Sequence, residues 1–194
     1  MINKIFSILL CFLFLFGCKN NKEYLITEID FSQFKGISFN ANDILVEDNS
    51  SKDINPPYID HLILNNINSY VNKWIKARIT TNLENENLVK IKIIKANVKA
   101  FPLNINNKLE EIFVNKAAVR IELDIYIIIE IIDSSEEKLA YVDLKAFKSK
   151  ELAENISLNE RDYYIQEMID EIMRDFDKLA VSKIKEIFYK YIKF

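Results

Sequence analysis

AAVRIELDIYIIIEII, residues 117–132, is the stretch of sequence that decides the fold. Every second residue in it is apolar and most charged side chains fall on the other face, which predicts a half-buried β-strand. Residues 138–146 alternate in the same way after a polar turn. Pairing the two segments across that turn places Ile127 opposite Leu144, so both apolar faces coincide. The sequence therefore predicts an antiparallel hairpin.

Periodicity also predicts the elements on either side of the hairpin. They are a strand at Ile37–Glu47, a helix at Ile59–Arg78 that starts after Asn55-Pro56, a strand at Val89–Ala100 with a β-bulge at Ile93–Ile94, a loop at Phe101–Lys116, and a helix from the capping box Ser157–Glu160 to about Ile192. The expected order is β-α-β-β-β-α. This order predicts an α+β fold, with a mainly antiparallel sheet of about four strands and both helices on one face.

The N-terminus has the features of a lipoprotein signal peptide, which we assign to residues 1–17. Lys4 precedes an apolar run that stops at Gly17, too short for a membrane-spanning helix of roughly 20 residues. Leu15 and Gly17 stand at the positions that mark signal cleavage before a lipid-modified Cys18. Acyl chains on Cys18 predict attachment to a membrane. A plain secretory signal, in which Cys18 is incidental, is the alternative.

Composition bounds the mature chain to one domain. Residues 18–35 are expected to hold the lipidated cysteine and a tether, and residues 36–194 a single periplasm-facing domain. Cys11 leaves with the signal and Cys18 is acylated, so no disulfide framework is expected. Without Lys4 the 26 basic residues fall to 25 against 29 acidic ones, a balance that does not favour nucleic-acid binding.

Residues suited to catalysis are few. His61, beside Asp60, is the single histidine of the chain, and no metal-binding motif or glycine-rich phosphate loop is present. A solvated or capping role for His61 is favoured over a place in a hydrolase triad. The sequence therefore predicts a protein that is not an enzyme and uses neither a cofactor nor a metal. Trp74 falls within the apolar stripe of its helix and is assigned to the core.

The second face of the hairpin mixes apolar and charged residues. The register above places Ile132 opposite Leu139, Glu130 opposite Tyr141, Ile128 opposite Asp143 and Tyr126 opposite Lys145, with Phe147 nearby. An apolar patch rimmed by charge is typical of a binding surface. We therefore name Tyr126, Ile128, Tyr141 and Phe147 as a candidate interaction surface. The alternative is that the Phe101–Lys116 loop covers this face.

A family resemblance covers most of the chain after the signal. The residues that carry it are Pro57, Asp60-His61, Trp74, Arg78, Ala96-Asn97-Val98, Leu103, Ser149, Glu151, Ser157 to Arg161 and Arg174 to Asp177. In these the chain resembles a group of short alphaproteobacterial lipoproteins of unassigned activity. In element order alone it is similar to the lipopolysaccharide-assembly lipoprotein that plugs an outer-membrane barrel, and to auxiliary lipoproteins of lipid-transporting ABC systems. Lys19-Asn20-Asn21 departs from the aromatic, glycine and proline-rich start usual in the assembly lipoprotein.

These resemblances imply an envelope address and a fold but no mechanism. Together with the sequence they lead us to expect a lipid-anchored, non-enzymatic accessory module that binds an envelope protein, in outer-membrane assembly or transport. Lys19, in place of the Asp that retains enteric lipoproteins at the inner membrane, favours the outer membrane. A carrier of lipid or another hydrophobic ligand is the second hypothesis, and a hydrolase that uses His61 is the third.

Overall fold

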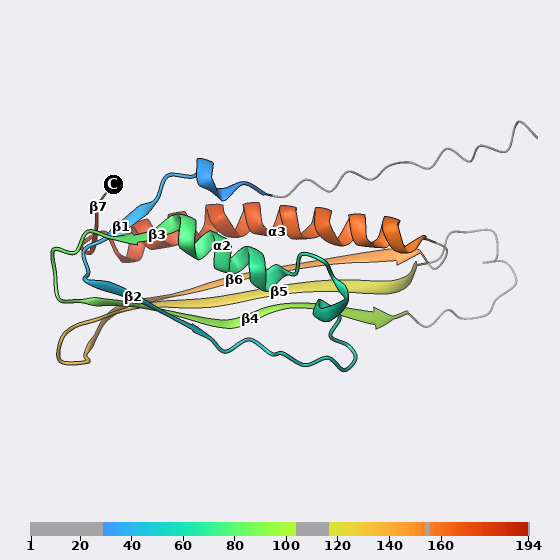
Figure 1. Ribbon diagram of the computed structural model, residues 1–194, viewed down its shortest axis with the longest axis horizontal. Helices are drawn as coiled ribbons and strands as arrows, with labels where there is room; N and C mark the ends of the chain where they lie inside the picture. The colour runs from blue at the N-terminus through green and yellow to red at the C-terminus, as the bar shows by residue number, and fades with distance from the viewer. Residues whose placement is uncertain (1–28, 104–116, 154–155, 194) are drawn as a thin grey trace, which may run out of the picture.

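One long four-stranded sheet, covered on a single face by two helices, makes up most of the molecule (Figure 1). The structure is a computed structural model that describes residues 29–103, 117–153 and 156–193. Its elements are η1 (Phe31–Gln33), β1 (Ile37–Phe39), β2 (Asp43–Asp48), η2 (Asp60–Leu62), α2 (Ile67–Arg78), β3 (Ile79–Thr81), β4 (Leu88–Pro102), β5 (Ala117–Ile132), β6 (Lys138–Ala153), α3 (Leu158–Ile187) and β7 (Ile192–Lys193).

The large sheet has the strand order β2-β4-β5-β6, and a small sheet has the order β3-β1-β7. Only β2 runs parallel to its neighbour in the large sheet, and the β4–β5 and β5–β6 pairs are antiparallel. The expected α+β class, the sheet of about four strands and the placement of both helices on one face are confirmed. The short strands of the small sheet add to the expected element order.

The β5–β6 hairpin has the predicted register, with Ile127 opposite Leu144. The side chains of β5 from Ile121 to Ile131 that face the helices are almost fully buried, which is why the alternation was so regular in the sequence. One predicted pair at the turn is wrong. Ile132 lies opposite Lys138 instead of Leu139, because the register shifts after Ile131.

The predicted bulge in β4 is confirmed. The register of β4 against β5 shifts between Ile93 and Lys95, so Ile94 is the extra residue. The apolar side chains therefore change from odd to even positions at this point and still face the helices. The bulge keeps the whole 15-residue strand on one core.

The predicted strand at Ile37–Glu47 is wrong as a single element. The chain passes from the small sheet to the large one at residues 40–42, since the Asn40 N–H donates to the carbonyl oxygen of Tyr191 and the Asn42 N–H donates to that of Asn87. β1 therefore pairs with β3 and β7, whereas β2 pairs with β4.

The predicted start of the first helix, after Asn55-Pro56, is also wrong. Residues 57–59 lie beside β4 instead, where Tyr58 forms an antiparallel bridge with Lys99, the Ala100 N–H donates to the carbonyl of Pro57 and the Ile59 N–H donates to that of Val98. The helix α2 begins at Ile67, and the side chain of Asn66 caps it by accepting from the backbone N–H of Ser69.

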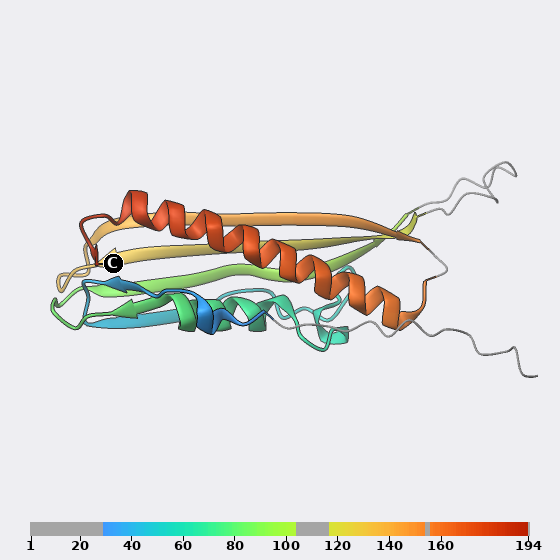
Figure 2. The ribbon, with the colours of Figure 1, turned by 90° about the horizontal axis from the view of Figure 1, so that it is seen from above.

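The long helix α3 crosses the sheet obliquely, with its C-terminal end over β6 and its N-terminal end towards the side of α2 (Figure 2). Ser157 caps it as predicted, accepting a hydrogen bond from the backbone N–H of Glu160 at 3.2 Å. The helix ends at Ile187, short of the predicted Ile192, because the chain turns there to place β7 in the small sheet.

The predicted signal peptide, Leu15, Gly17 and the lipidated Cys18 lie outside the described residues, as does most of the tether. Within residues 29–103, 117–153 and 156–193, no helix is both long and apolar enough to cross a membrane.

Candidate interaction surface

The four residues of the predicted interaction surface share the sheet face that is turned away from the helices. Tyr126 and Ile128 on β5 alternate with buried core residues and are half-buried. Tyr141 and Phe147 on β6 are 56% and 62% exposed, respectively. The structure thus places all four on one face, and the two aromatic side chains of β6 present the larger contact area.

Tyr126 is fixed by its neighbours on β6. Its hydroxyl donates to Asp143 Oδ1 at 3.1 Å, and the Lys145 ammonium lies 4.3 Å from the centroid of its ring. Burial, followed by the hydrogen bond to the Asp143 carboxylate, raises the pKa of the Tyr126 hydroxyl. Tyr126 is therefore a neutral, oriented part of this face.

Glu130 is the one acidic residue that this face buries among the described residues, at 3% exposure. Lys92 and Lys138 approach its two carboxylate oxygens at 2.8 and 2.5 Å. Burial pushes the pKa of Glu130 upward, but the hydrogen bonds from the two lysines outweigh it and the net shift is downward. Glu130 also raises the pKa of Lys138, whose ammonium lies 5.3 Å from the Tyr141 ring centroid.

These contacts show that the Glu130 carboxylate is compensated by its two lysines. Lys95 likewise pairs with Asp124 at 3.0 Å, and Lys90 pairs with Glu47 at 2.7 Å. Sequence reasoning placed Glu130 on this face but missed its burial, since that depends on lysines from two other parts of the chain. The alternative was that the Phe101–Lys116 loop covers this face. Most of that loop, residues 104–116, lies outside the described residues.

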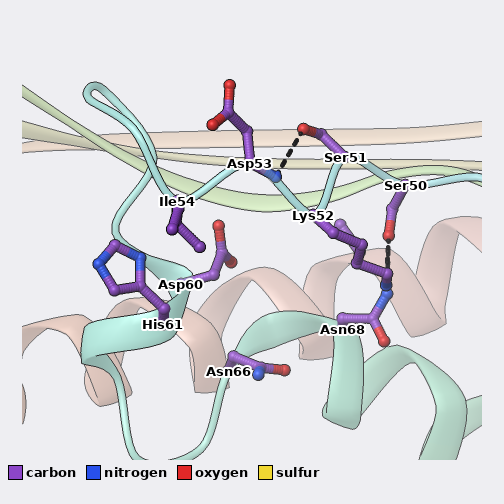
Figure 3. A pocket seen from close by; sticks show the side chains of 10 residues that line it. Ser50, Ser51, Lys52, Asp53, Ile54, Asp60, His61, Asn66 and Asn68 are labelled. Carbon is purple, nitrogen blue, oxygen red and sulfur yellow. Dashed lines mark hydrogen bonds between the residues drawn. The ribbon is translucent and has the colours of Figure 1, made fainter.

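A second candidate is a 210 Å³ pocket between the β2–η2 segment and the start of α2, which is open to solvent (Figure 3). It contains His61 and Asp60, the residues considered for a hydrolase. Figure 3 shows His61 and Ser50 at opposite ends of the pocket. Asp60 Oδ1 accepts the backbone N–H of Val98 at 3.0 Å, and burial raises the pKa of this carboxyl. The Asp60 carboxylate therefore binds the backbone of β4, and His61 points away from Ser50.

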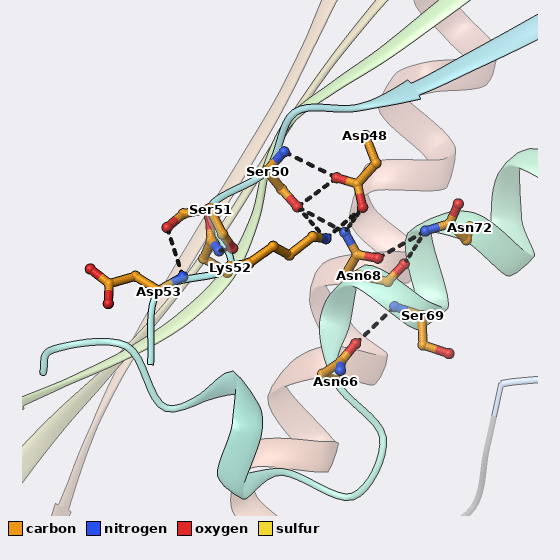
Figure 4. A network of polar contacts seen from close by, with 10 residues as sticks. Asp48, Ser50, Ser51, Lys52, Asp53, Asn66, Asn68, Ser69 and Asn72 are labelled. Atoms are coloured by element: carbon orange, nitrogen blue, oxygen red, sulfur yellow. Dashed lines mark hydrogen bonds and ion pairs between the residues drawn. The ribbon is translucent and has the colours of Figure 1, made fainter. Parts of the chain in front are cut away.

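The serine and lysine of this pocket form a structural network (Figure 4). Lys52 Nζ lies 3.1 Å from Ser50 Oγ, a pair that could suggest a serine–lysine dyad. The same ammonium pairs with Asp48 Oδ2 at 2.5 Å, so Lys52 joins Asp48 and Ser50 within the network. Asn68 donates to both Asp48 and Ser50, which ties β2 to α2.

Asp48 is the centre of this network. Partial burial acts to raise its pKa, but hydrogen bonds from Lys52, Ser50 and Asn68 outweigh burial and lower the pKa to about 2. Sequence reasoning missed this cluster. The Asp-x-Ser spacing of Asp48 and Ser50 was the available signal, because an aspartate often accepts the N–H two residues later.

Two further features of the described residues bear on ligand binding. In the part of the chain that the structure describes, no group of three or more His, Cys, Asp or Glu side chains could hold a metal ion. An open pocket of 570 Å³ lies between residues 29–32 and Lys73, Lys76 and Ala77 of α2. It is not an enclosed apolar cavity of the kind that a lipid carrier uses.

Comparisons with known proteins give structural neighbours for this chain but assign it to no family. No protein-family model matches the chain, and no curated protein matches its sequence. Solved structures that it is similar to are rare lipoprotein B from Shewanella oneidensis (8% identity, 73% of this chain and 92% of that one, TM-score 0.37) and a minor lipoprotein from Acinetobacter baumannii (13%, 73%, 92%, 0.35). A third is a DUF330 protein from Xanthomonas campestris (6%, 77%, 86%, 0.35). At these TM-scores the likeness assigns neither a fold nor a function to this chain.

Proposed function

We propose that this chain is a lipid-anchored protein of the cell envelope whose domain is a non-enzymatic accessory module that binds another envelope protein. The anchor is Cys18, at the end of the signal formed with Leu15 and Gly17. Lys19 after it supports an outer-membrane location, and outer-membrane assembly or transport is the proposed setting. The binding surface is the outer sheet face with Tyr126, Ile128, Tyr141 and Phe147.

One observation carries the binding role. Tyr141 and Phe147 are more than half exposed on a face where the buried Glu130 is already paired with Lys92 and Lys138. Aromatic side chains are enriched at protein interfaces, where they bury a large area at low cost in conformational entropy. A rigid β-sheet holds these two in fixed positions, as an interface anchor requires.

The binding role is tested by photocrosslinking in cells. A photoreactive phenylalanine analogue replaces Tyr141 or Phe147, and Tyr189, an aromatic residue beyond α3 that is 65% exposed, is the control position. We expect a discrete adduct with another envelope protein from positions 141 and 147, distinct in mass from any adduct between two copies of this chain, and none from 189. The adduct from position 141 should disappear when Phe147→Glu is added. No adduct, or the same adduct from position 189, would overturn the proposed surface.

The anchor is tested separately. Cells fed a labelled fatty acid should label the wild-type protein but not Cys18→Ala, because Cys18 is the proposed site of the acyl chains, which supply about 0.8 kcal/mol of membrane affinity for each buried methylene. A wild-type protein without label, or a Cys18→Ala protein that carries it, would contradict the lipid anchor at Cys18 and leave the binding role to the crosslinking result.

A further inference from the structure

The edge of the large sheet formed by β6 is unpaired in the described residues. β6 has 16 residues and stands last in the strand order β2-β4-β5-β6. No strand of residues 29–103, 117–153 or 156–193 pairs with its outer side. An edge strand of this length offers a row of backbone N–H and C=O groups to another strand.

The two ends of the β6 edge differ in whether charged side chains face the helices. Lys148 and Lys150 point to the helix side and pair with Glu171 at 2.6 Å and Glu167 at 3.0 Å. Inward lysines of this kind discourage strand addition. Residues 139–147 contain no such inward charge, since the residues there that face the helices are apolar. The accessible stretch is therefore centred near Leu144.

The sequence of this stretch is complementary to itself. When β6 is paired antiparallel with a second β6 so that Leu144 lies opposite Leu144, Asp143 lies opposite Lys145 of the other copy. Tyr141 then lies opposite Phe147. The two-fold symmetry repeats each pair. Opposite charges and aromatic residues are the cross-strand pairs that stabilise antiparallel sheets.

Neighbouring registers lose this match. In such a dimer the outer faces of both sheets lie on the same side. The alternative registers that keep this arrangement move the two-fold axis from Leu144 to a neighbouring residue of β6. A centre at Asp143 places that carboxylate opposite itself, and a centre at Lys145 places two ammonium groups opposite each other. Like charges directly opposite each other are destabilising. The centre at Leu144 is therefore the selected register.

The charges of α3 agree with the same two-fold axis. Residues 160–177 carry seven acidic and two basic side chains, whereas residues 178–193 carry five basic and one acidic. α3 runs antiparallel to β6, and the Lys148–Glu171 pair sets its level along the strand. A two-fold axis through Leu144 then brings the acidic half of one α3 to the level of the basic half of the other.

We infer that β6 pairs antiparallel with β6 of a second copy of this chain, with Leu144 at the two-fold axis, to form a continuous eight-stranded sheet. This pairing uses the strand edge and does not depend on the proposed envelope partner. It joins the outer faces of two sheets, so the Tyr141 and Phe147 side chains of both copies lie on one surface.

A charge-swap experiment tests the pairing. The mature lipidated protein is extracted in detergent, and its dimer dissociation constant is measured by analytical ultracentrifugation in the absence of other proteins. Asp143→Lys places lysines opposite each other twice in the dimer, and the Kd should rise roughly tenfold or more. Asp143→Lys combined with Lys145→Asp restores opposite charges and should return the Kd to within about threefold of the wild-type value.

Glu86→Lys, the same charge change at an exposed loop position far along the chain from β6, is the control and should leave the Kd unchanged. Circular dichroism confirms that each variant is folded. The inference would be overturned if the wild-type chain stays monomeric. It would also be overturned if the β6 edge accepts a strand only from a different protein. A double variant that fails to recover the dimer would overturn the register.

Discussion

Arg78 of α2 and Asp177 of α3 form a buried ion pair with two parallel hydrogen bonds. Arg78 Nη2 lies 2.6 Å from Asp177 Oδ2, and Arg78 Nε lies 2.7 Å from Oδ1. Trp74 Nε1 donates to the same Oδ1 at 2.8 Å, and Arg78 Nη1 donates to the carbonyl of Lys35 at 2.6 Å. One carboxylate thus joins both helices, and its arginine reaches the N-terminal segment.

Asp177→Ala should destabilise the domain by about 3 kcal/mol or more, because it leaves the Arg78 charge and the Trp74 N–H buried without their acceptor. Asp175→Ala, which removes an exposed carboxylate two residues earlier, is the control and should change stability by less than about 0.5 kcal/mol. Urea denaturation of both variants measures the difference. Equal losses would show that the ion pair contributes no more than a surface charge.

Ile127→Ala should cost about 3 kcal/mol, because Ile127 is fully buried beneath the helices and its truncation leaves a cavity. Ile128→Ala changes the next residue of the same strand on the half-buried outer face and should cost about 1 kcal/mol. Thermal unfolding measures both. The reverse order of the two losses would mean that the helices cover the other face of β5.

Asp48 should contribute to the loss of stability in acid. Its folded pKa of about 2 lies below the usual value of 3.8, so its stabilisation is present above pH 4 and disappears as the pH falls towards 2. Asp48→Asn should therefore flatten the decline of unfolding free energy between about pH 4 and pH 2. Urea titrations across that range measure it. Parallel curves for both proteins would show that the network does not hold Asp48 ionised.

His61→Ala should leave the stability within about 0.5 kcal/mol of the wild type, because His61 is exposed on the short helix η2. It should also complement a strain that lacks the gene as well as the wild-type chain does. Growth under envelope stress, with unfolding of the purified variant, tests both expectations. A variant that keeps its stability but fails to complement would support the hydrolase hypothesis.

The parts of the fold that could be predicted from the sequence are those whose apolar and polar residues alternate within a single strand or hairpin. The alternation of β5 and β6 fixed both the strands and the Ile127–Leu144 register, because a one-residue slip would bury their charges. The bulge at Ile94 was visible for the same reason. Four residues of the outer face were placed correctly, since they are the positions that alternate with the core.

Features that depend on distant parts of the chain were missed. Asn55-Pro56 is a helix-start signal, yet the following residues 57–59 form backbone hydrogen bonds with β4. The strand predicted at Ile37–Glu47 is divided between two sheets for a similar reason. The burial of Glu130 depends on Lys92 of another strand, and the link from the local Asp48–Ser50–Lys52 cluster to α2 depends on Asn68, 20 residues after Asp48.

The extra residue in β4 marks the position at which this strand can vary in length. The half of β4 before Ile94 lies beside β2, and the half after it lies beside residues 57–59. Removal of Ile94 would leave the Ile93–Ile127 and Ala96–Ile125 pairs in place, so the apolar side chains on both sides would alternate strictly and still face the helices. Removal of one residue elsewhere in β4 would instead turn over the residues on one side of the deletion and direct a lysine such as Lys90 or Lys99 at the helices. Homologous chains should therefore lose a single residue of β4 only at the bulge.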